Sequence, residues 1–201
     1  MKKSQKHKKH VKKFVYRLFY AIIFLIILKY LSGYFYKRYY TFLPTIRVYP
    51  SNENELIIIK KEYIEKRTKE DIDFFYLTDP SVVYAFKNVV SETIDDMMNI
   101  VFSPHLLIII LGLKIFINRP RPQQIDNNLD ILRSTTANTG AFPSGHTTQA
   151  YYLAKKLSQR YPDKKKLLFE IAEKCGNARI YAGLHYPSDH NFGKYIALNL
   201  L

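Results

Sequence analysis

The stretch Phe142–Thr148 (Phe-Pro-Ser-Gly-His-Thr-Thr) constrains the fold more than any other, because it reads as the start of a helix. Apolar residues then recur every three or four positions from Ala150 to Tyr161, as on one helical face. The pattern predicts a helix over residues 144–160, with Pro143-Ser144-Gly145-His146 as its first turn. First-turn N–H groups lack acceptors within the helix and lie at its positive end, so they can bind an anion such as phosphate. The alternative is an ordinary Pro-Ser helix start with an incidental histidine.

The charge of the chain is concentrated at its beginning. The 201 residues carry a formal net charge of +14, but residues 1–40 hold nine Lys, two Arg and no acid, which leaves only +3 for residues 41–201. With 47% hydrophobic residues the chain can form a core, and its single cysteine, Cys175, excludes an intramolecular disulfide. We predict a basic anchoring segment, 1–40, followed by a folded domain, 41–201.

Residues 18–36 are the candidate membrane segment, since they include one charge, Lys29, in a stretch close to the ~20 residues that span a bilayer. The basic tail before them favours a cytoplasmic N-terminus, with the domain on the non-cytoplasmic side. A cleaved signal peptide is the alternative, but no small-residue cleavage site follows. The tail could also bind nucleic acid, but an apolar helix directly after it argues against this. We predict one membrane helix and no nucleic-acid partner.

Three further stretches have simple interpretations. Residues 41–76, with two prolines and a Ser-Asn-Glu-Asn turn signal, are predicted to be an irregular linker and packing arm. Asp79-Pro80 is a helix-start pair, and the apolar stripe behind it predicts a helix to Asn99. The apolar residues 106–117 predict a buried core helix rather than a second membrane segment, because twelve residues are too few to span a bilayer.

Positive side chains follow at the end of that core helix. Lys114 lies within it, and Arg121, seven residues later, lies in the proline-stiffened Asn118-Arg119-Pro120-Arg121-Pro122. A planar guanidinium suits bidentate phosphate binding, and a desolvated ammonium adds a point charge. The alternative is a snorkelling lysine followed by a basic loop. A polar loop is predicted for residues 123–141.

The last part of the chain contributes an arginine, a histidine and a carboxylate. A charged amphipathic helix is predicted after Pro162, with Leu168, Ala172, Cys175 and Arg179 on its buried face. A buried arginine needs an ion-pair partner or a bound anion. Asp189 follows His185 by four residues, so its carboxylate can accept from one ring nitrogen and leave the other available as a nucleophile. A purely structural His-Asp hydrogen bond is the alternative.

Taken together, Lys114-x6-Arg121-Pro122, Pro143-Ser144-Gly145-His146 and Arg179-x5-His185-x3-Asp189 resemble the three-part signature of the phosphatidic acid phosphatase type 2 superfamily. The resemblance covers residues 114–189 and implies an all-α helical bundle, here preceded by one transmembrane helix. Ala178 stands where the family usually has serine, and Arg119 is a second arginine beside Arg121.

The resemblance also implies a mechanism. His185 would form a phosphohistidine, Asp189 would orient it, and His146 would protonate the leaving group. The phosphoryl oxygens would be bound by the remaining motif residues: Lys114, Arg121, Arg179 and the backbone N–H groups of Ser144 and Gly145. No metal or other cofactor is expected, because three cations and a helix N-terminus can stabilise the transferring phosphoryl group.

The charged residues between the second and third motifs resemble the soluble class A acid phosphatases more than the multispan lipid phosphatases. We therefore expect a metal-independent phosphomonoesterase on a membrane anchor. A lipid phosphate phosphatase is the first alternative, and a non-enzymatic membrane-surface protein is the second. The sequence leaves the oligomeric state open.

Overall fold

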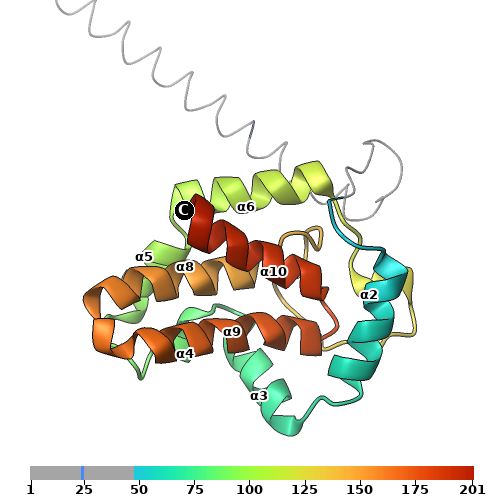
Figure 1. Cartoon of the computed structure of the whole chain (residues 1–201), viewed down its shortest axis with the longest axis horizontal. Helices are drawn as coiled ribbons and strands as arrows, with labels where there is room; N and C mark the ends of the chain where they lie inside the picture. Colours follow the sequence, from blue (N-terminus) through green and yellow to red (C-terminus); the bar gives the residue numbers. More distant parts are fainter. Residues whose placement is uncertain (1–23, 25–47) are drawn as a thin grey trace, which may run out of the picture. The chain divides into compact units, whose positions relative to one another are not determined.

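The computed structural model describes Phe24 and residues 48–201. Residues 48–201 belong to one compact unit, in which the regular elements are all helical (Figure 1). In chain order these elements are α2 (Asn52–Ile58), the π-helix η1 (Ile59–Ile64), α3 (Lys69–Thr78), α4 (Val83–Phe86), α5 (Ile94–Val101), α6 (Pro104–Ile117), α7 (Pro122–Ile125), α8 (Gly145–Arg160), the 3-10 helix η2 (Pro162–Lys164), α9 (Lys165–Tyr181), α10 (Pro187–Tyr195) and the π-helix η3 (Ile196–Leu200). The predicted all-α class is confirmed for this part of the chain. The predicted membrane helix at 18–36 lies outside the described residues except for Phe24, and the predicted boundary after residue 40 lies wholly outside them.

Helix α8 is the element against which the other long helices pack, with α9 and α10 in direct contact with it (Figure 1). It begins where the sequence predicts, because Ser144 caps it: the Ser144 hydroxyl accepts the N–H of Thr147. The predicted buried face of α9 is also confirmed. Leu168, Ala172 and Cys175 are buried in the core with the apolar side of α8, and Arg179 is only 1% exposed.

Helix α6 matches the predicted core helix, but only one of its faces is buried. Lys114 lies on the buried face with Leu106 and Ile110, whereas Ile108 and Phe116 on the outer face are 71% and 58% exposed. None of the helices described is long and apolar enough by itself to cross a membrane. The consecutive stretches Ile94–Val101 and Pro104–Ile125 meet the length and hydropathy requirements only together, and they are bent by 47°.

The linker predicted for residues 41–76 is wrong over its described part, which is mostly helical. Ser51 caps α2 by accepting the N–H of Asn54, so the Ser-Asn-Glu-Asn signal is a helix start and not a turn. Thr68 and Asp71 form a reciprocal capping box at the start of α3. These helices have few buried apolar residues each, so their hydrophobic periodicity is weak and the caps were the better signal.

The continuous helix predicted from Asp79 to Asn99 is also wrong. Asp79 is the C-cap of α3, and its carboxylate accepts the Thr135 N–H and pairs with Arg179, so it cannot cap a following helix. The chain instead makes the short α4 and then restarts at α5, which Thr93 caps. The apolar positions of the stripe still face the core, where Val83, Phe86 and Met97 are fully buried.

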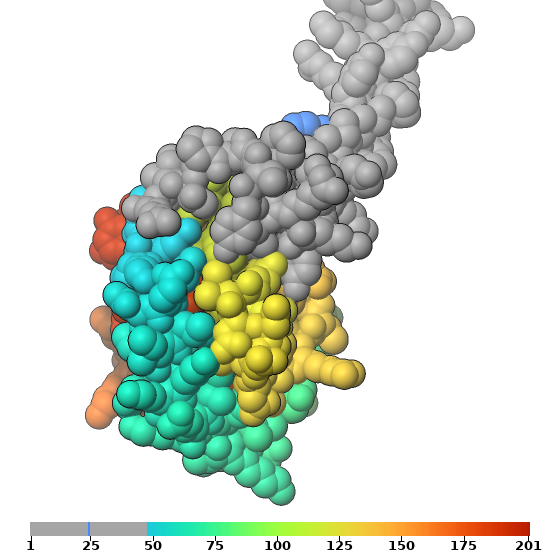
Figure 2. All heavy atoms as spheres, turned by 90° about the vertical axis from the view of Figure 1, so that its right-hand side faces the viewer, coloured from blue at the N-terminus to red at the C-terminus, as the bar shows by residue number. Residues whose placement is uncertain are grey.

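The loop predicted for residues 123–141 is confirmed after the short helix α7. Figure 2 shows the face of the molecule on which α2 and η1, in cyan, lie beside the yellow segment that follows α6. An ion pair of 2.6 Å between Lys60 of η1 and Asp126 joins the two segments. Helix α2 packs against α7, the short helix that begins directly after Arg121.

Candidate active site

Six of the eight predicted site residues line one open cleft with a volume of about 230 Å³. They come from α6, from the loop before α7, from α8, from α9 and from the loop before α10: Lys114, Arg121, Gly145, His146, Arg179 and His185. The other two, Ser144 and Asp189, are fully buried and do not line the cleft. Residues far apart in the sequence thus form one polar site.

Lys114 reaches the cleft from the buried face of α6. Its ammonium donates to the carbonyl oxygen of Gly140 at 2.6 Å. Burial and the nearby Arg121 lower the pKa of Lys114 well below its usual range, because both disfavour an additional positive charge. A bound anion would favour the charged form of this side chain.

Two arginines lie on other walls of the same cleft. The Arg121 guanidinium donates to the carbonyl oxygens of Thr139 at 2.8 Å and Leu184 at 2.9 Å, which fixes its plane. Arg179 forms an ion pair of 2.7 Å with Asp79, and burial lowers the pKa of Arg179 to about 10. Its Nε is buried and has no hydrogen-bond partner among the described residues. Burial of a donor without a partner costs free energy.

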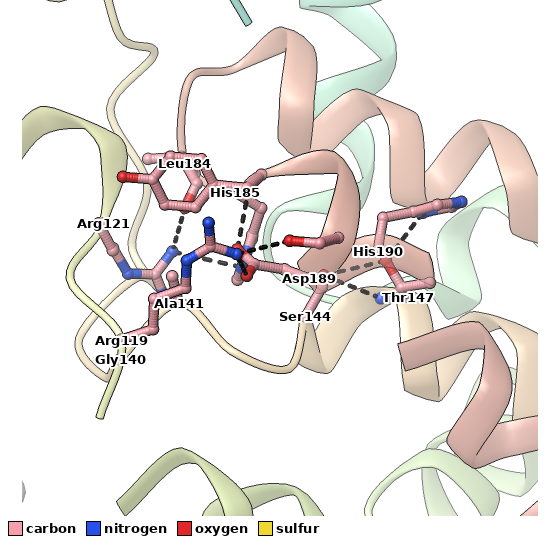
Figure 3. Close-up of polar contacts among 12 residues, drawn as sticks. Arg119, Arg121, Gly140, Ala141, Ser144, Thr147, Leu184, His185, Asp189 and His190 are labelled. Carbon is pink, nitrogen blue, oxygen red and sulfur yellow. Dashed lines mark hydrogen bonds and ion pairs between the residues drawn. The ribbon is translucent and has the colours of Figure 1, made fainter. Parts of the chain in front are cut away.

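His185 lies between a carboxylate and an arginine (Figure 3). Its Nδ1 is 3.1 Å from Asp189 Oδ2, and its Nε2 is 3.3 Å from Arg121 Nη1. Burial raises the pKa of Asp189, but Arg119 and the Tyr186 N–H oppose this and favour the carboxylate. The carboxylate accepts the proton on Nδ1, so Nε2 carries the lone pair. Burial and the nearby cations, Arg121 first, keep the pKa of His185 well below its usual range, so the ring is neutral at pH 7.

His146 lines the same cleft from the first turn of α8. Its Nε2 is 3.0 Å from the carbonyl oxygen of Asp79, which can only accept, so Nε2 carries a proton. Burial and the charge of Arg179 lower the pKa of His146 to about 3. The two histidines therefore have different partners, a carboxylate for His185 and a carbonyl for His146.

The first turn of α8 differs in one respect from the prediction. The Ser144 N–H donates to the carbonyl oxygen of Asp189 at 3.0 Å, so it is already used and is not directed at an anion in the cleft. The Ser144 hydroxyl is fully buried and accepts a hydrogen bond of 2.9 Å from the Thr147 hydroxyl. Gly145 does line the cleft, and a methyl group added there would lie 3.7 Å from Lys114 Cε. Among the described residues, no group of three or more His, Cys, Asp or Glu side chains is arranged to hold a metal.

Comparison with protein families identifies the relatives of this site. The model of the PAP2 superfamily matches residues 97–201, which is just over half of the chain and includes all three motifs. The chain belongs to the PAP2 superfamily. This agrees with the resemblance found in the sequence.

Similar PAP2 proteins include both acid and lipid phosphatases. Non-specific acid phosphatases of Salmonella typhi and Salmonella typhimurium are 35% and 33% identical over 63 residues, which is 31% of this chain and 25% of each relative. The match thus spans about a quarter of the length of those relatives. The crystal structure of Aquifex aeolicus LpxE is 25% identical, with a TM-score of 0.54 over 77% of this chain and 94% of LpxE. A transmembrane PAP2 type phosphatidylglycerolphosphate phosphatase from Bacillus subtilis has the same fold. It is 19% identical, with a TM-score of 0.50 over 88% of this chain and 90% of the phosphatase.

The structure of this PAP2 chain also separates its two neighbouring arginines. Arg121 lines the cleft beside His185, as the seven-residue offset from Lys114 predicts. Arg119 is fully buried, does not line the cleft and forms an ion pair of 2.7 Å with Asp189. The seven-residue spacing therefore correctly predicted that Arg121, and not Arg119, lines the cleft.

Sequence reasoning missed Asp79 and Glu55, which are the partners of buried arginines. Asp79 pairs with Arg179, and Glu55 pairs with Arg119 at 2.7 Å. The requirement that a buried arginine has a partner was the available signal for Asp79. No local pattern pointed to Glu55, because it lies 64 residues before Arg119.

Proposed function

We propose that this protein is a phosphoric monoester hydrolase that acts through a phosphohistidine at His185. The observation that carries the proposal is the state of His185 in the cleft: Nδ1–H donates to Asp189, and the unprotonated Nε2 accepts from Arg121 Nη1 at 3.3 Å, next to a cation that we assign to the phosphoryl group. A neutral imidazole held in one tautomer is the form that can attack phosphorus.

The cations around His185 would bind the phosphoryl group. Lys114, Arg121 and Arg179 line the cleft from three different elements, and Arg179 Nε is a donor that lacks a partner among the described residues. The N–H of Gly145, at the start of α8, is a fourth donor that we assign to a phosphoryl oxygen. Phosphoryl transfer depends mainly on such positioning and charge stabilisation.

The reaction then follows in two steps. In the first step Nε2 of His185 forms a bond to phosphorus as the bond to the ester oxygen breaks, and His146 gives a proton to the departing alkoxide. In the second step water attacks the phosphohistidine, His146 accepts a proton from that water, and inorganic phosphate leaves His185 free. His146 must be protonated for the first step. The negative charge of the substrate favours this, because it offsets the positive charge of Arg179.

A lipid phosphate is the second candidate substrate, and the wall of the cleft favours it. Apolar side chains of α6 and its flanking turn lie beside the cations, and two of them, Phe102 and Leu111, are 47% and 44% exposed. The apolar lining consists of Pro80, Phe102, Leu107, Ile110 and Leu111. An acyl or alkyl chain could lie against this wall while its phosphate contacts the cations.

We also propose that residues 18–36 anchor the protein in a membrane by a single helix, with the N-terminus in the cytoplasm and the catalytic domain on the other side. The support is the apolar run with one lysine and the basic tail before it. Retention of the full-length protein in the membrane fraction after a carbonate wash is expected. Release of the intact protein by that wash would contradict the anchor.

Phosphate release by the full-length protein in detergent tests the proposed activity. Nitrophenyl phosphate, a short alkyl phosphate and phosphatidic acid in mixed micelles are compared, and His185→Ala is the control. We expect release from at least one substrate, unchanged by a chelator and inhibited by vanadate, which can imitate the five-coordinate transition state. Phosphatidic acid hydrolysed in preference to both soluble esters would select the lipid candidate. No release from any ester by a folded protein would favour the non-enzymatic alternative.

A further inference from the structure

Arg119 is a buried cation that the three motifs do not include. Its side chain is fully buried, and its guanidinium lies between two aromatic rings, 4.1 Å from the centre of Tyr49 and 3.7 Å from that of Tyr186. Aromatic faces on both sides fix the plane of a guanidinium. The directions of its donor atoms are therefore set by the fold.

One of these donors reaches the carboxylate that holds His185 (Figure 3). Arg119 Nη1 is 2.7 Å from Asp189 Oδ1, while Asp189 Oδ2 accepts from the Tyr186 N–H at 2.9 Å and faces His185 Nδ1 at 3.1 Å. Both oxygens of Asp189 are thus occupied, and the carboxylate cannot turn without losing a charged hydrogen bond. Because Arg119 binds Oδ1, it keeps Oδ2 directed at His185 Nδ1, and this contact orients the His185 ring.

The other donors of Arg119 reach helix α2. Nη2 is 2.7 Å from Glu55 Oε2, and Nε is 2.9 Å from Asn52 Oδ1. Glu55 is only 5% exposed, and its Oε1 accepts the N–H of Ser188 at 2.8 Å, in the first turn of α10. Helix α2 therefore contacts both Arg119 and the helix that carries Asp189.

We propose that Arg119 is a positioning residue for the Asp189–His185 pair and that Glu55 of α2 holds Arg119 in place. The inference rests on the proposed function, since positioning matters only if His185 reacts. It makes α2 part of the catalytic apparatus, although α2 lies before residues 97–201, which the family model matches. Arg119 acts through Asp189 and does not contact the phosphoryl group.

Conservative substitutions test this assignment in the full-length protein. Arg119→Lys keeps the positive charge but removes the planar guanidinium with its separate donor nitrogens. A single ammonium cannot donate to both Asp189 and Glu55 in the same geometry. Glu55→Gln keeps the shape of the side chain and removes its charge. Arg160→Lys is the matched control, because Arg160 also pairs with a glutamate, Glu92, but at a site where its side chain is 60% exposed.

Both test variants are expected to slow phosphohistidine formation at saturating substrate by roughly 10-fold or more, the size expected for a lost charged hydrogen bond, with a smaller change in KM. The control should leave both quantities unchanged. In an Asp189→Asn background Arg119→Lys should have little further effect, because residues that act as one unit are not additive. Equal effects with and without the Asp189 carboxylate would show a structural role only and overturn the proposal.

The tautomer of His185 gives a readout that does not depend on activity. Nitrogen NMR should show a proton on Nδ1 in the wild type and a mixture of Nδ1-H and Nε2-H forms in Arg119→Lys and Glu55→Gln. If Arg119→Lys does not fold, the rate and the His185 tautomer of the isosteric variant Glu55→Gln test the proposal. A wild type that releases no phosphate would refute the proposed function, whereas an active wild type whose variants keep its rate and its His185 tautomer would refute only the positioning role.

Discussion

The two histidines of the cleft differ in their hydrogen-bond acceptors, and this difference supports the separate roles that we propose for them. The Nδ1–H of His185 donates to the Asp189 carboxylate, which is itself held by Arg119, so the other ring nitrogen, Nε2, has a fixed direction. His146 binds a neutral carbonyl, that of Asp79, which does not compensate a positive ring as a carboxylate would. Its protonation state is therefore sensitive to charge in the cleft.

That sensitivity gives a prediction at the level of one residue. The pKa of His146, about 3 in the free protein, should rise when phosphate or vanadate binds, because the anion offsets the charge of Arg179 that helps to lower it. Binding should accordingly be accompanied by proton uptake at pH values between the pKa of His146 in the free protein and its pKa in the complex. NMR titration of the histidine signals with and without vanadate measures the shift.

His105, which pairs with the Tyr152 hydroxyl and does not line the cleft, is the internal control for that titration. Its signals should not respond to vanadate. A His146 pKa that stays the same with the anion bound would exclude His146 as the general acid in the form described.

At the level of elements, the sequence predicted the helices whose apolar residues recur on one face. These are α6, α8 and α9, whose buried positions match the pattern. It did not predict α2, whose few buried apolar residues give a weak periodicity and whose Ser51 cap resembles a turn signal. It also did not predict the break after Asp79, because the carboxylate of Asp79 pairs with Arg179, which lies far away in the chain. The cleft residues could be predicted from motif spacing, whereas the residues that position them could not, since no local periodicity encodes a long-range ion pair.

The packing of α9 on α10 gives a prediction for this level. A methyl group at Gly176 would lie 2.1 Å from His190 Nδ1 and 2.9 Å from Thr147 Oγ1, so Gly176→Ala should destabilise the fold by roughly 1–3 kcal/mol. Gly112→Ala is the matched control in α6, where nothing lies within 4 Å, and it should stabilise by about 0.5–1 kcal/mol. Denaturant unfolding of both variants measures the difference. Equal stabilities would show that α10 is not packed closely on α9.

At the level of the whole molecule, folding buries two neutral histidines beside positively charged side chains, and the free energy of unfolding therefore depends on pH. His146 and His185 have pKa values below the ~6.5 of an unfolded histidine. Between pH ~6.5 and about 3 the unfolded chain therefore binds protons that the folded chain does not, so stability falls as the pH falls through this window. The lowered pKa of Asp79 adds a further loss below pH ~4, when its carboxylate is protonated in the unfolded chain.

The expected loss of unfolding free energy from pH 7 to pH 5 is about 2 kcal/mol for one such histidine. His146→Gln removes one titrating group and should flatten the dependence by about that amount. Urea unfolding at the two pH values, with wild type and variant side by side, measures it. The same slope in both proteins would mean that His146 is not held neutral in the folded state.

The central claim is that His185 carries the phosphoryl group during turnover. Rapid quenching of the full-length protein mixed with radiolabelled substrate, followed by peptide mapping, tests it most directly. The account predicts an acid-labile, base-stable label on His185 that is absent in His185→Ala and still forms in His146→Ala when the leaving group is a nitrophenolate, which needs little protonation. A label on His146, or any covalent label in the His185→Ala protein, would contradict the account.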